Sequence, residues 1–474
     1  MRTGYHMRTG PRVRAGPRVR AGAALALAVL LLSGAAAGAA DDPGTTLIYP
    51  PFGHCLGMHR ATRFHLFLYL GTRTRFNEPA GLAAVKLDAL DDPSTTADDD
   101  ELTVFGLNSG QCEIIYNTSL VNVETYGECG DGRGQFRDPL GIAADTRGNV
   151  FVADTGNHRI VRLLYRDAGL EFIKSFGEEG SGELGFSRPS DIALGESGTL
   201  YVADTGNDRV VALAPTGEWL HETKGDPDNG VTLDHPVGLA VVEADDPWIS
   251  RRQSFVVVSD SGGDRLVKLS LDGRLLGVIA AVDLPVQPAR FDRLAVDYYG
   301  SVYATDGLNG RIHKFDRELR YVTSVGSPGT GDMELDEPRG ITLWRRFGQI
   351  FITERTGAQY FWIGADILDL ELAPDTVRPG AYELALRYYL TETARVTIEL
   401  VDKEGDVVHR LVDNRRRALG DNVERWDGML GRRGGPAPPG NYTLRMTATP
   451  TYSSGEYFHD TAETALVVEP AASP

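Results

Sequence analysis

Five polar residues stand at a recurring position of the chain where related segments carry mostly small or apolar side chains: Ser190, Asp191, Asp292, Arg293 and Arg339. Carboxylate and guanidinium groups that converge on one place can orient a small or peptide ligand by charge-assisted hydrogen bonds. The same residues also suit a solvated rim joined by salt bridges, which is the more common arrangement. Both interpretations require that segments far apart in the sequence meet in space.

Other groupings with catalytic potential are scarce. The sequence has no G-x-S-x-G elbow, no H-E-x-x-H, no P-loop and no G-x-G-x-x-G between a strand and a helix. His54 and His59 flank Cys55, but no second cluster completes a metal site there. The acidic run Asp91–Glu101 could hold calcium, although it lacks the spacing of a loop that wraps an ion, and a solvated hairpin insertion is the preferred interpretation. The sequence therefore indicates no definite cofactor, and calcium at the acidic run stays open as the alternative.

The N-terminal residues predict export. Six arginines precede an apolar run from Ala23 to Leu32, and small residues follow up to Ala40, as in a cleaved secretory signal peptide over residues 1–40. The run is too short for a membrane anchor, and no later segment is long and apolar enough to span a bilayer. The net charge is −18, and it becomes −24 without the six arginines of this segment. We therefore expect a secreted or periplasmic protein that does not bind nucleic acid.

Internal repeats organise most of the remaining sequence. Residues 135–163 and 186–213 are two copies of one unit, and four more divergent copies surround them. Each unit has three short β-rich runs separated by Gly, Asp and Asn turns, and a fourth run follows. Four strands in 40 to 50 residues are typical of a propeller blade. The residues that end the second runs are spaced by 46, 50, 56, 46 and 48 residues: Asn108, Asp154, Asp204, Asp260, Asp306 and Glu354.

At these residues the chain resembles the NHL repeat family. The second copy carries the family pattern most fully, at Pro139, Gly141, Ile142, Ala143, Asp145, Gly148, Val152, Ala153, Asp154, Gly156, Asn157, Arg159 and Ile160. The resemblance implies a six-bladed β-propeller over residues 64–366. In the amidating lyase that shares this propeller, histidines that bind zinc follow the proline of the innermost strand. The corresponding residues here are Ala80, Leu140, Ser190, Val237, Asp292 and Arg339, so a zinc site of that type is not expected.

Several details of this propeller can be predicted. The run Phe64–Leu70 is expected to form the outer strand of the last blade and so to close the ring, while residues 41–63 form an N-terminal extension. Cys112 and Cys129 are the preferred disulfide pair among three cysteines, with three buried thiols as the alternative. Trp248 lies in an insertion between two strands and is a candidate contact residue.

Residues 367–470 differ from the repeats. Strand-like runs alternate with turns over a length that suits a small β-sandwich. The order Trp426-Asp427-Gly428 and then Gly440-Asn441-Tyr442 is similar to the Ig-like domain of flagellar hook-capping proteins. Trp426 is expected to fill the core and Asp427-Gly428 to turn the chain, which favours a structural role over a ligand site.

The sequence as a whole predicts an all-β fold, a six-bladed β-propeller followed by an Ig-like β-sandwich. The preferred function is an exported binding or scaffolding protein of the bacterial cell envelope or exterior, which presents propeller loops to a protein, peptide or glycan. The alternative is an enzyme, a lyase or hydrolase that could depend on a metal, with Asp292, Arg293 and Arg339 as polar groups at the channel mouth.

Overall fold

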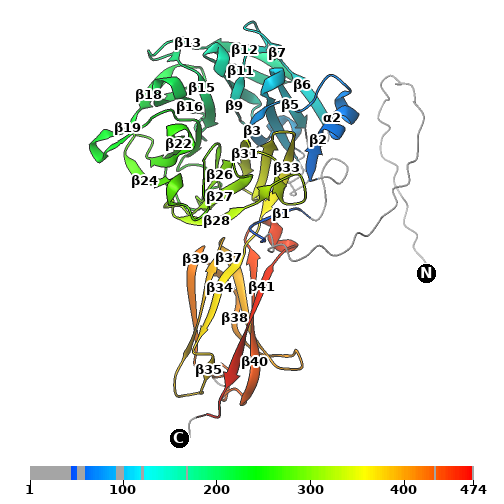
Figure 1. Cartoon of the computed structure of the whole chain (residues 1–474), viewed down its shortest axis with the longest axis vertical. Coiled ribbons are helices and arrows are strands. Elements are labelled where there is room, and N and C mark those ends of the chain that lie inside the picture. Colours follow the sequence, from blue (N-terminus) through cyan, green and yellow to red (C-terminus); the bar gives the residue numbers. More distant parts are fainter. Residues whose placement is uncertain are drawn as a thin grey trace, which may run out of the picture. The chain divides into compact units, whose positions relative to one another are not determined.

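The computed structural model describes residues 44–50, 59–91, 101–118, 122–166, 169–431 and 434–471. Within these ranges the chain is almost entirely β, and four-stranded sheets follow one another around a ring in chain order (Figure 1). No described helix is long and apolar enough to cross a membrane. The expected signal peptide, His54, Cys55 and residues 92–100 of the acidic run lie outside the described residues.

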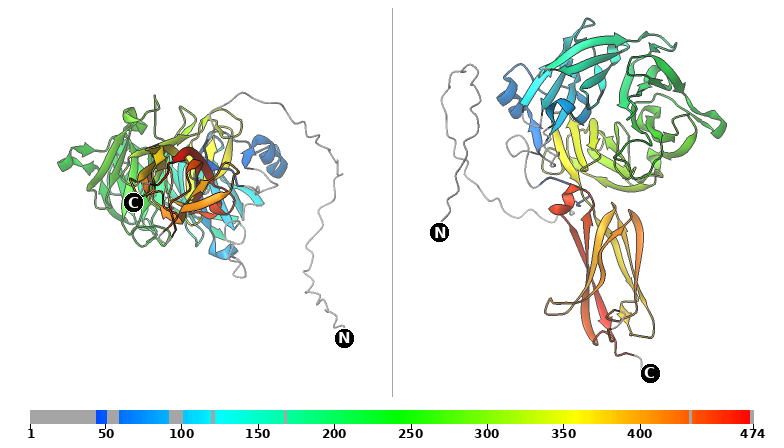
Figure 2. Two further views of the ribbon diagram at one scale, coloured as in Figure 1. Left: turned by 90° about the horizontal axis from the view of Figure 1, so that it is seen from below. Right: turned by 180° about the vertical axis from the view of Figure 1, so that it is seen from behind.

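Six sheets of the described chain form the blades, and the right-hand view of Figure 2 shows the ring that they make. The first five blades are β3–β6 (Pro79–Lys86, Leu102–Asn108, Glu113–Thr118, Asn122–Tyr126), β9–β12 (Pro139–Ala144, Asn149–Asp154, Arg159–Arg166, Gly169–Phe176), β15–β18 (Pro189–Leu194, Leu200–Asp204, Arg209–Leu213, Trp219–Thr223), β21–β24 (Gly238–Val242, Phe255–Asp260, Arg265–Leu269, Leu275–Ala280) and β25–β28 (Leu294–Val296, Val302–Asp306, Arg311–Phe315, Tyr321–Val325). The sixth blade contains β31–β33 (Gly340–Trp344, Gln349–Glu354, Gly357–Ile363).

Burial explains the residue pattern of the blades. The second strands, such as β16 and β22, are buried along their whole length because neighbouring blades cover both of their faces. Outer strands such as β12 alternate between more and less exposed residues, since one face meets solvent. The continuous apolar runs of the sequence therefore correspond to the inner strands of the ring.

The acid that ends the second strand is a recurring anchor. Asp154, Asp204 and Asp260 each accept a hydrogen bond from a backbone N–H in the loop that leads into the same blade, over 2.7 to 2.8 Å. Each also pairs with the arginine that starts the third strand: Arg159, Arg209 and Arg265. The recurrence of this arginine thus reflects blade geometry rather than a unique site.

The ring closes differently from the prediction. Arg63–Leu70 is the helix α2, not a strand, and the outer edge of β33 pairs instead with β1 (Leu47–Ile48) and β2 (Arg60–Thr62). Thr62 caps the helix, because its backbone N–H donates to His65 Nδ1 and its side chain forms a capping box. The expected strand was wrong because an unbroken apolar run suits a helix as well as a strand. Part of the expected N-terminal extension therefore belongs to the last blade.

Short ladders connect several blades and carry the disulfide. They are β7–β8 (Glu128–Cys129, Gln135–Phe136), β13–β14 (Glu178–Glu179, Gly185–Phe186), β19–β20 (Gly225–Asp226, Val231–Thr232) and β29–β30 (Ser327–Pro328, Glu334–Leu335). Cys112, which follows the turn after β4, is bonded to Cys129 in β7. The bond links the first blade to the ladder that leads into the second.

The C-terminal strands form a two-sheet sandwich. One sheet contains β34 (Ile367–Ala373), β36 (Leu384–Leu390) and β39 (Gly420–Trp426). The other contains β35 (Thr376–Val377), β41 (Asp460–Val468), β40 (Gly440–Pro450), β37 (Ala394–Val401) and β38 (Val407–Arg417). Trp426 lies in the core, as expected, and its indole N–H donates to the Met429 carbonyl. The Asp427 side chain accepts the Met429 backbone N–H and stabilises the turn.

Candidate functional site

The six residues that directly follow the proline of each repeat, or Phe291 in the fifth repeat, line one depression at the mouth of the propeller channel. These residues are Ala80, Leu140, Ser190, Val237, Asp292 and Arg339, and the depression has a volume of about 480 Å³. Leu140 and Ser190 are each the extra residue of a β-bulge, where the innermost strand slips against the second strand. The bulge turns these side chains out of the ladder toward the channel.

Arg293 lines both this mouth and the channel below it. Its guanidinium donates to the Ser190 carbonyl at 3.0 Å and to the Val237 carbonyl, so it connects three blades. Its Nε lies 4.0 Å from Asp191 Oδ1. Asp191 is buried and accepts backbone N–H groups from Ile192 and Leu239. Burial raises the pKa of Asp191, and the charge of Arg293 partly opposes that rise.

The rim of the mouth carries ion pairs. Asp292 accepts the Gly307 backbone N–H at 3.0 Å and pairs with Arg290 at 3.1 Å. Arg339 pairs with Glu78 and with Glu337. The side chains of Asp292 and Arg339 are 27% and 29% exposed, so both can reach solvent. The rim therefore forms a network of solvated salt bridges, which is one of the two interpretations of the sequence. Its charged side chains are still accessible to a ligand.

The structure brings Ser190, Asp292, Arg293 and Arg339 together at the mouth, and Asp191 lies one step deeper in the channel. Trp248 is apart from them. It lies in the loop between β21 and β22, which is at the opposite end of the strands from the mouth, where Arg346 stacks on its ring.

Sequence reasoning missed three members of the rim: Glu78, Arg290 and Glu337. Glu78 and Glu337 directly precede Pro79 and Pro338, and their φ angles are positive, at 52° and 51°. Asp138, Arg188 and His235 have similar angles at equivalent places in other blades. The position directly before the proline of each repeat was the sequence signal that could have identified these rim residues.

The Ser190 hydroxyl has a structural use. It accepts a hydrogen bond from Thr205 Oγ1 at 2.6 Å and donates to the Val237 carbonyl at 3.1 Å. No histidine lines the mouth among the described residues. In the part of the chain that the structure describes, one trio could hold a metal ion, Asp208, Asp234 and His235, and it lies outside the mouth. His235 already pairs with Asp234 at 2.6 Å.

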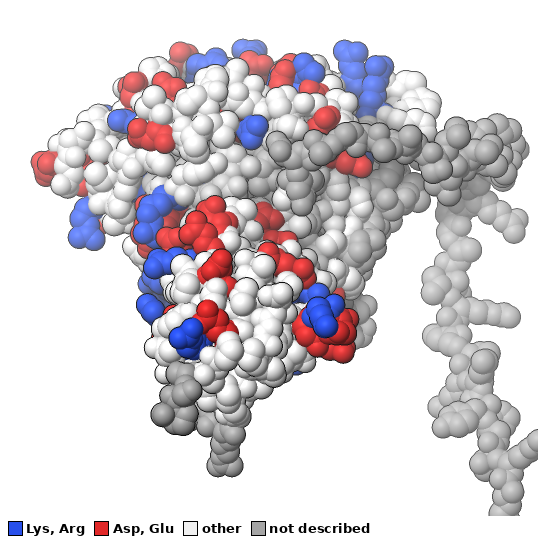
Figure 3. Space-filling view, turned by 60° about the horizontal axis from the view of Figure 1, so that its bottom comes forward, with Lys and Arg blue, Asp and Glu red and all other residues white. Residues whose placement is uncertain are grey.

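Charge on the surface is mixed. On the face drawn in Figure 3, acidic and basic side chains are interspersed and no continuous basic patch is visible. Basic side chains are thus spread among acidic ones on this face, although the sequence has a net charge of −18.

Comparisons with known proteins match parts of the chain. The NHL repeat model matches residues 136–163 and 186–213, and the FlgD Ig-like domain model matches residues 375–451. A comparison with curated protein sequences finds no significant match.

Several solved structures share the propeller at low identity. A gluconolactonase from Xanthomonas campestris is 16% identical with a TM-score of 0.43, over 68% of this chain and 99% of that one. Virginiamycin B lyase from Staphylococcus aureus is 15% identical with a TM-score of 0.38, over 55% and 76%. A PQQ-bound aldose sugar dehydrogenase from Streptomyces coelicolor is 15% identical with a TM-score of 0.41, over 61% and 96%. The family-model matches, together with the sheets described above, identify the chain as a β-propeller protein with NHL repeats and a C-terminal FlgD-type Ig-like domain.

Proposed function

We propose that this chain is an exported binding protein that holds a peptide segment of a partner at the mouth of its propeller. The ligand would carry both a charged group and an apolar side chain. The FlgD-type domain would serve as a spacer or a second contact.

The distribution of residue types around the mouth carries this proposal. The charged rim residues come from three neighbouring blades: Arg290 and Asp292 lead into the fifth, Glu337 and Arg339 into the sixth, and Glu78 into the first. The remaining blades contribute Leu140, Val237 and the hydroxyl of Ser190. Similar blades would place similar residues at equivalent positions around the mouth if no part of it were specialised. The charged half and the mainly uncharged half of the mouth therefore favour a site for an amphipathic ligand.

The rim ion pairs can be exchanged at low cost. Exposed salt bridges contribute about 0 to 1 kcal/mol, because solvent screens the charges. A carboxylate of the ligand can therefore replace Glu78 or Glu337 on Arg339, and a ligand cation can replace Arg290 on Asp292. Leu308 is 64% exposed at the same mouth and offers an apolar contact.

An immobilised library of octapeptides that differ in charge and apolar content tests the proposal. The full chain should select peptides that combine both features. Because an exposed ion pair with the ligand contributes up to about 1 kcal/mol, Asp292→Ala and Arg339→Ala should each weaken binding by up to about 5-fold. Arg320→Ala, which removes an exposed arginine outside the mouth, is the matched control.

Equal binding by the native chain and both mouth variants would exclude the mouth as the site. Mass spectrometry of the retained peptides separates binding from the enzyme alternative. Intact peptides support a binding protein, whereas cleavage that depends on Asp292 or Arg339 would support a hydrolase.

A further inference from the structure

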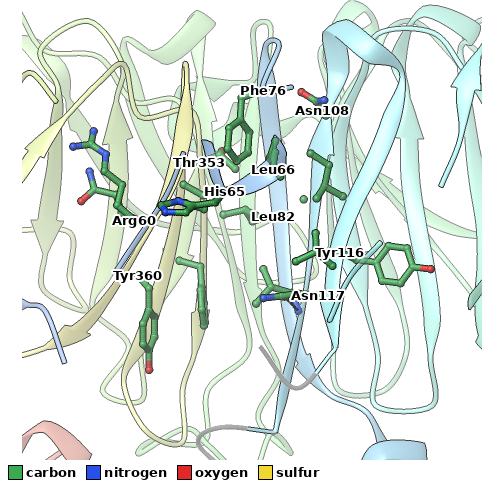
Figure 4. A pocket seen from close by; sticks show the side chains of 18 of the residues that line it. Arg60, His65, Leu66, Phe76, Leu82, Asn108, Tyr116, Asn117, Thr353 and Tyr360 are labelled. Atoms are coloured by element: carbon green, nitrogen blue, oxygen red, sulfur yellow. Dashed lines mark hydrogen bonds between the residues drawn. The ribbon is translucent and has the colours of Figure 1, made fainter. Parts of the chain in front are cut away.

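An apolar pocket lies between the first and last blades, beside helix α2 and away from the channel mouth. Its volume is about 190 Å³. Leu82 and Val104 come from the first blade, Phe351 and Ala358 come from the last, and Leu66 of α2 lies against both. Figure 4 shows His65 between the strands of the two blades, with Tyr360 on one side and Tyr116 and Asn117 on the other.

Most polar side chains around this pocket are committed to the protein. Gln359 donates to the Glu334 carbonyl and to Glu354, and it accepts the Tyr49 hydroxyl. Asn108 donates to Glu113 and to the Arg75 carbonyl and accepts the Asn77 backbone N–H. These groups present mainly carbon atoms to the space, so the walls are chiefly apolar.

Polar groups of His65, Asn117 and His59 remain for a ligand. The Thr62 backbone N–H donates to His65 Nδ1 at 3.0 Å, which leaves the proton of the neutral ring on Nε2. The Asn117 side-chain oxygen accepts the Val104 backbone N–H at 3.2 Å, and the Asn117 amino group has no partner among the described residues. His59 Nδ1 is buried without a hydrogen-bond partner in the described chain. A buried polar atom without a partner requires an explanation, and a bound molecule is one.

Among the described residues that line the pocket, no charged group is free to receive an ion. Burial lowers the pKa of both His59 and His65, which favours their neutral forms at neutral pH. The guanidinium of Arg60 is already paired with Glu354 and with the Thr330 carbonyl. A charged ligand would lose its hydration here without gaining an opposite charge.

We propose that this pocket binds one small, uncharged molecule with an apolar body of one or two fused rings and a single hydroxyl or carbonyl group. The size follows from the volume, because apolar cavities of about 150 Å³ accept a benzene ring. The polar group would accept from His65 Nε2 or the Asn117 amino group, and a hydroxyl could also donate to His59. This site is independent of the channel mouth.

Calorimetric titration of the full chain with 2-naphthol tests the proposal, since this molecule is uncharged at pH 7 and has two rings and one hydroxyl. Binding should saturate at one molecule per chain. 2-Naphthalenesulfonate, which has the same rings and a fixed negative charge, should bind at least 10-fold more weakly. Equal binding of the two compounds would overturn the proposal, because it would place the probe on a surface that tolerates charge.

Two variants fill the pocket from opposite sides, and one variant controls for nonspecific adsorption. Ala358→Phe on β33 and Val104→Phe on β4 should each reduce affinity for 2-naphthol at least 10-fold, with folding checked by circular dichroism. Leu68→Ser removes a 55% exposed apolar side chain of α2 that does not line the pocket, and it should leave binding unchanged. Unchanged affinity in a folded pocket-filling variant, or loss of binding in Leu68→Ser, would refute the proposed site.

Discussion

Arg60 Nη2 lies 2.7 Å from Glu354 Oε2, and this ion pair joins two strands that are 294 residues apart in the sequence. In the second, third and fourth blades the acid pairs with an arginine five residues later, as Asp204 does with Arg209. In the last blade that later position holds Gln359, which also donates to Glu354. The arginine comes instead from β2. The N-terminal part of the propeller therefore supplies the last blade with both an outer strand and the cation that pairs with its buried acid.

Arg60→Ala should therefore destabilise the propeller. Glu354 has a side chain that is only 1% exposed, and loss of a charged hydrogen bond costs about 1 to 3 kcal/mol, since Gln359 and the Asp336 backbone N–H still bind the carboxylate. Urea denaturation measures the change in the free energy of unfolding. Arg63→Ala removes a nearby exposed arginine and is the control. Equal stability of the two variants would show that the ion pair does not hold the ring closed.

Arg293→Ala should lower stability for a different reason. Its guanidinium serves carbonyl groups of two other blades and faces buried Asp191, so removal leaves a buried carboxylate without its cation. A loss of about 1 to 3 kcal/mol is expected by thermal or urea unfolding. Arg293→Lys should recover only part of it, because one ammonium cannot reproduce the planar fork of the guanidinium. Full recovery by lysine would show that charge alone matters.

Stability should fall as the pH rises from about 4 to about 7. Asp297 is buried, and this burial, reinforced by the charge of Glu392 and opposed by that of Lys314, raises its pKa from 3.8 to about 7. The folded protein therefore binds this proton more tightly than the unfolded chain does. The stabilisation is fully present below the unfolded pKa and is lost as the pH passes the folded pKa, and it amounts to at most about 4 kcal/mol.

Asp297→Asn should flatten this part of the stability profile. An asparagine oxygen can still accept the backbone N–H groups of Ser301 and Tyr299, which Asp297 now binds at 2.8 and 2.9 Å. Unfolding free energies of the native chain, of Asp297→Asn and of Asp421→Asn, an exposed control, are compared between pH 4 and 7. The prediction fails if the difference between the native chain and Asp297→Asn does not change with pH.

Reduction of the Cys112–Cys129 bond should destabilise the first blade. The two cysteines are 17 residues apart, and closing a loop of this size restricts the unfolded chain by about 3 kcal/mol. The double variant Cys112→Ser, Cys129→Ser should lose this stability and no longer respond to reductant. A Cys55→Ser variant should respond as the native chain does. A native chain that unfolds at the same urea concentration with and without reductant would contradict the prediction.

The sequence by itself determined the architecture of most of the chain. The spacing of the repeats, their turn residues and their apolar runs predict blades of four strands. Each repeat can bury its apolar faces only against neighbouring repeats. The repeat pattern also predicts the equivalent positions at the channel mouth, which Asp292 and Arg339 both line. Trp426 was correctly expected in the sandwich core, since a large aromatic side chain gains most from burial there.

Only the tertiary structure decided how the ring closes. Residues 63–70 satisfy either a helix or a strand locally, and the choice depends on whether the edge of β33 is already occupied. Short segments at Leu47–Ile48 and Arg60–Thr62 occupy it, although their brevity gave no strand signal. The apolar pocket between Ala358 and Val104 follows from that closure, because it exists only where the first and last blades meet beside α2. A local pattern cannot encode a contact between residues that far apart in the chain.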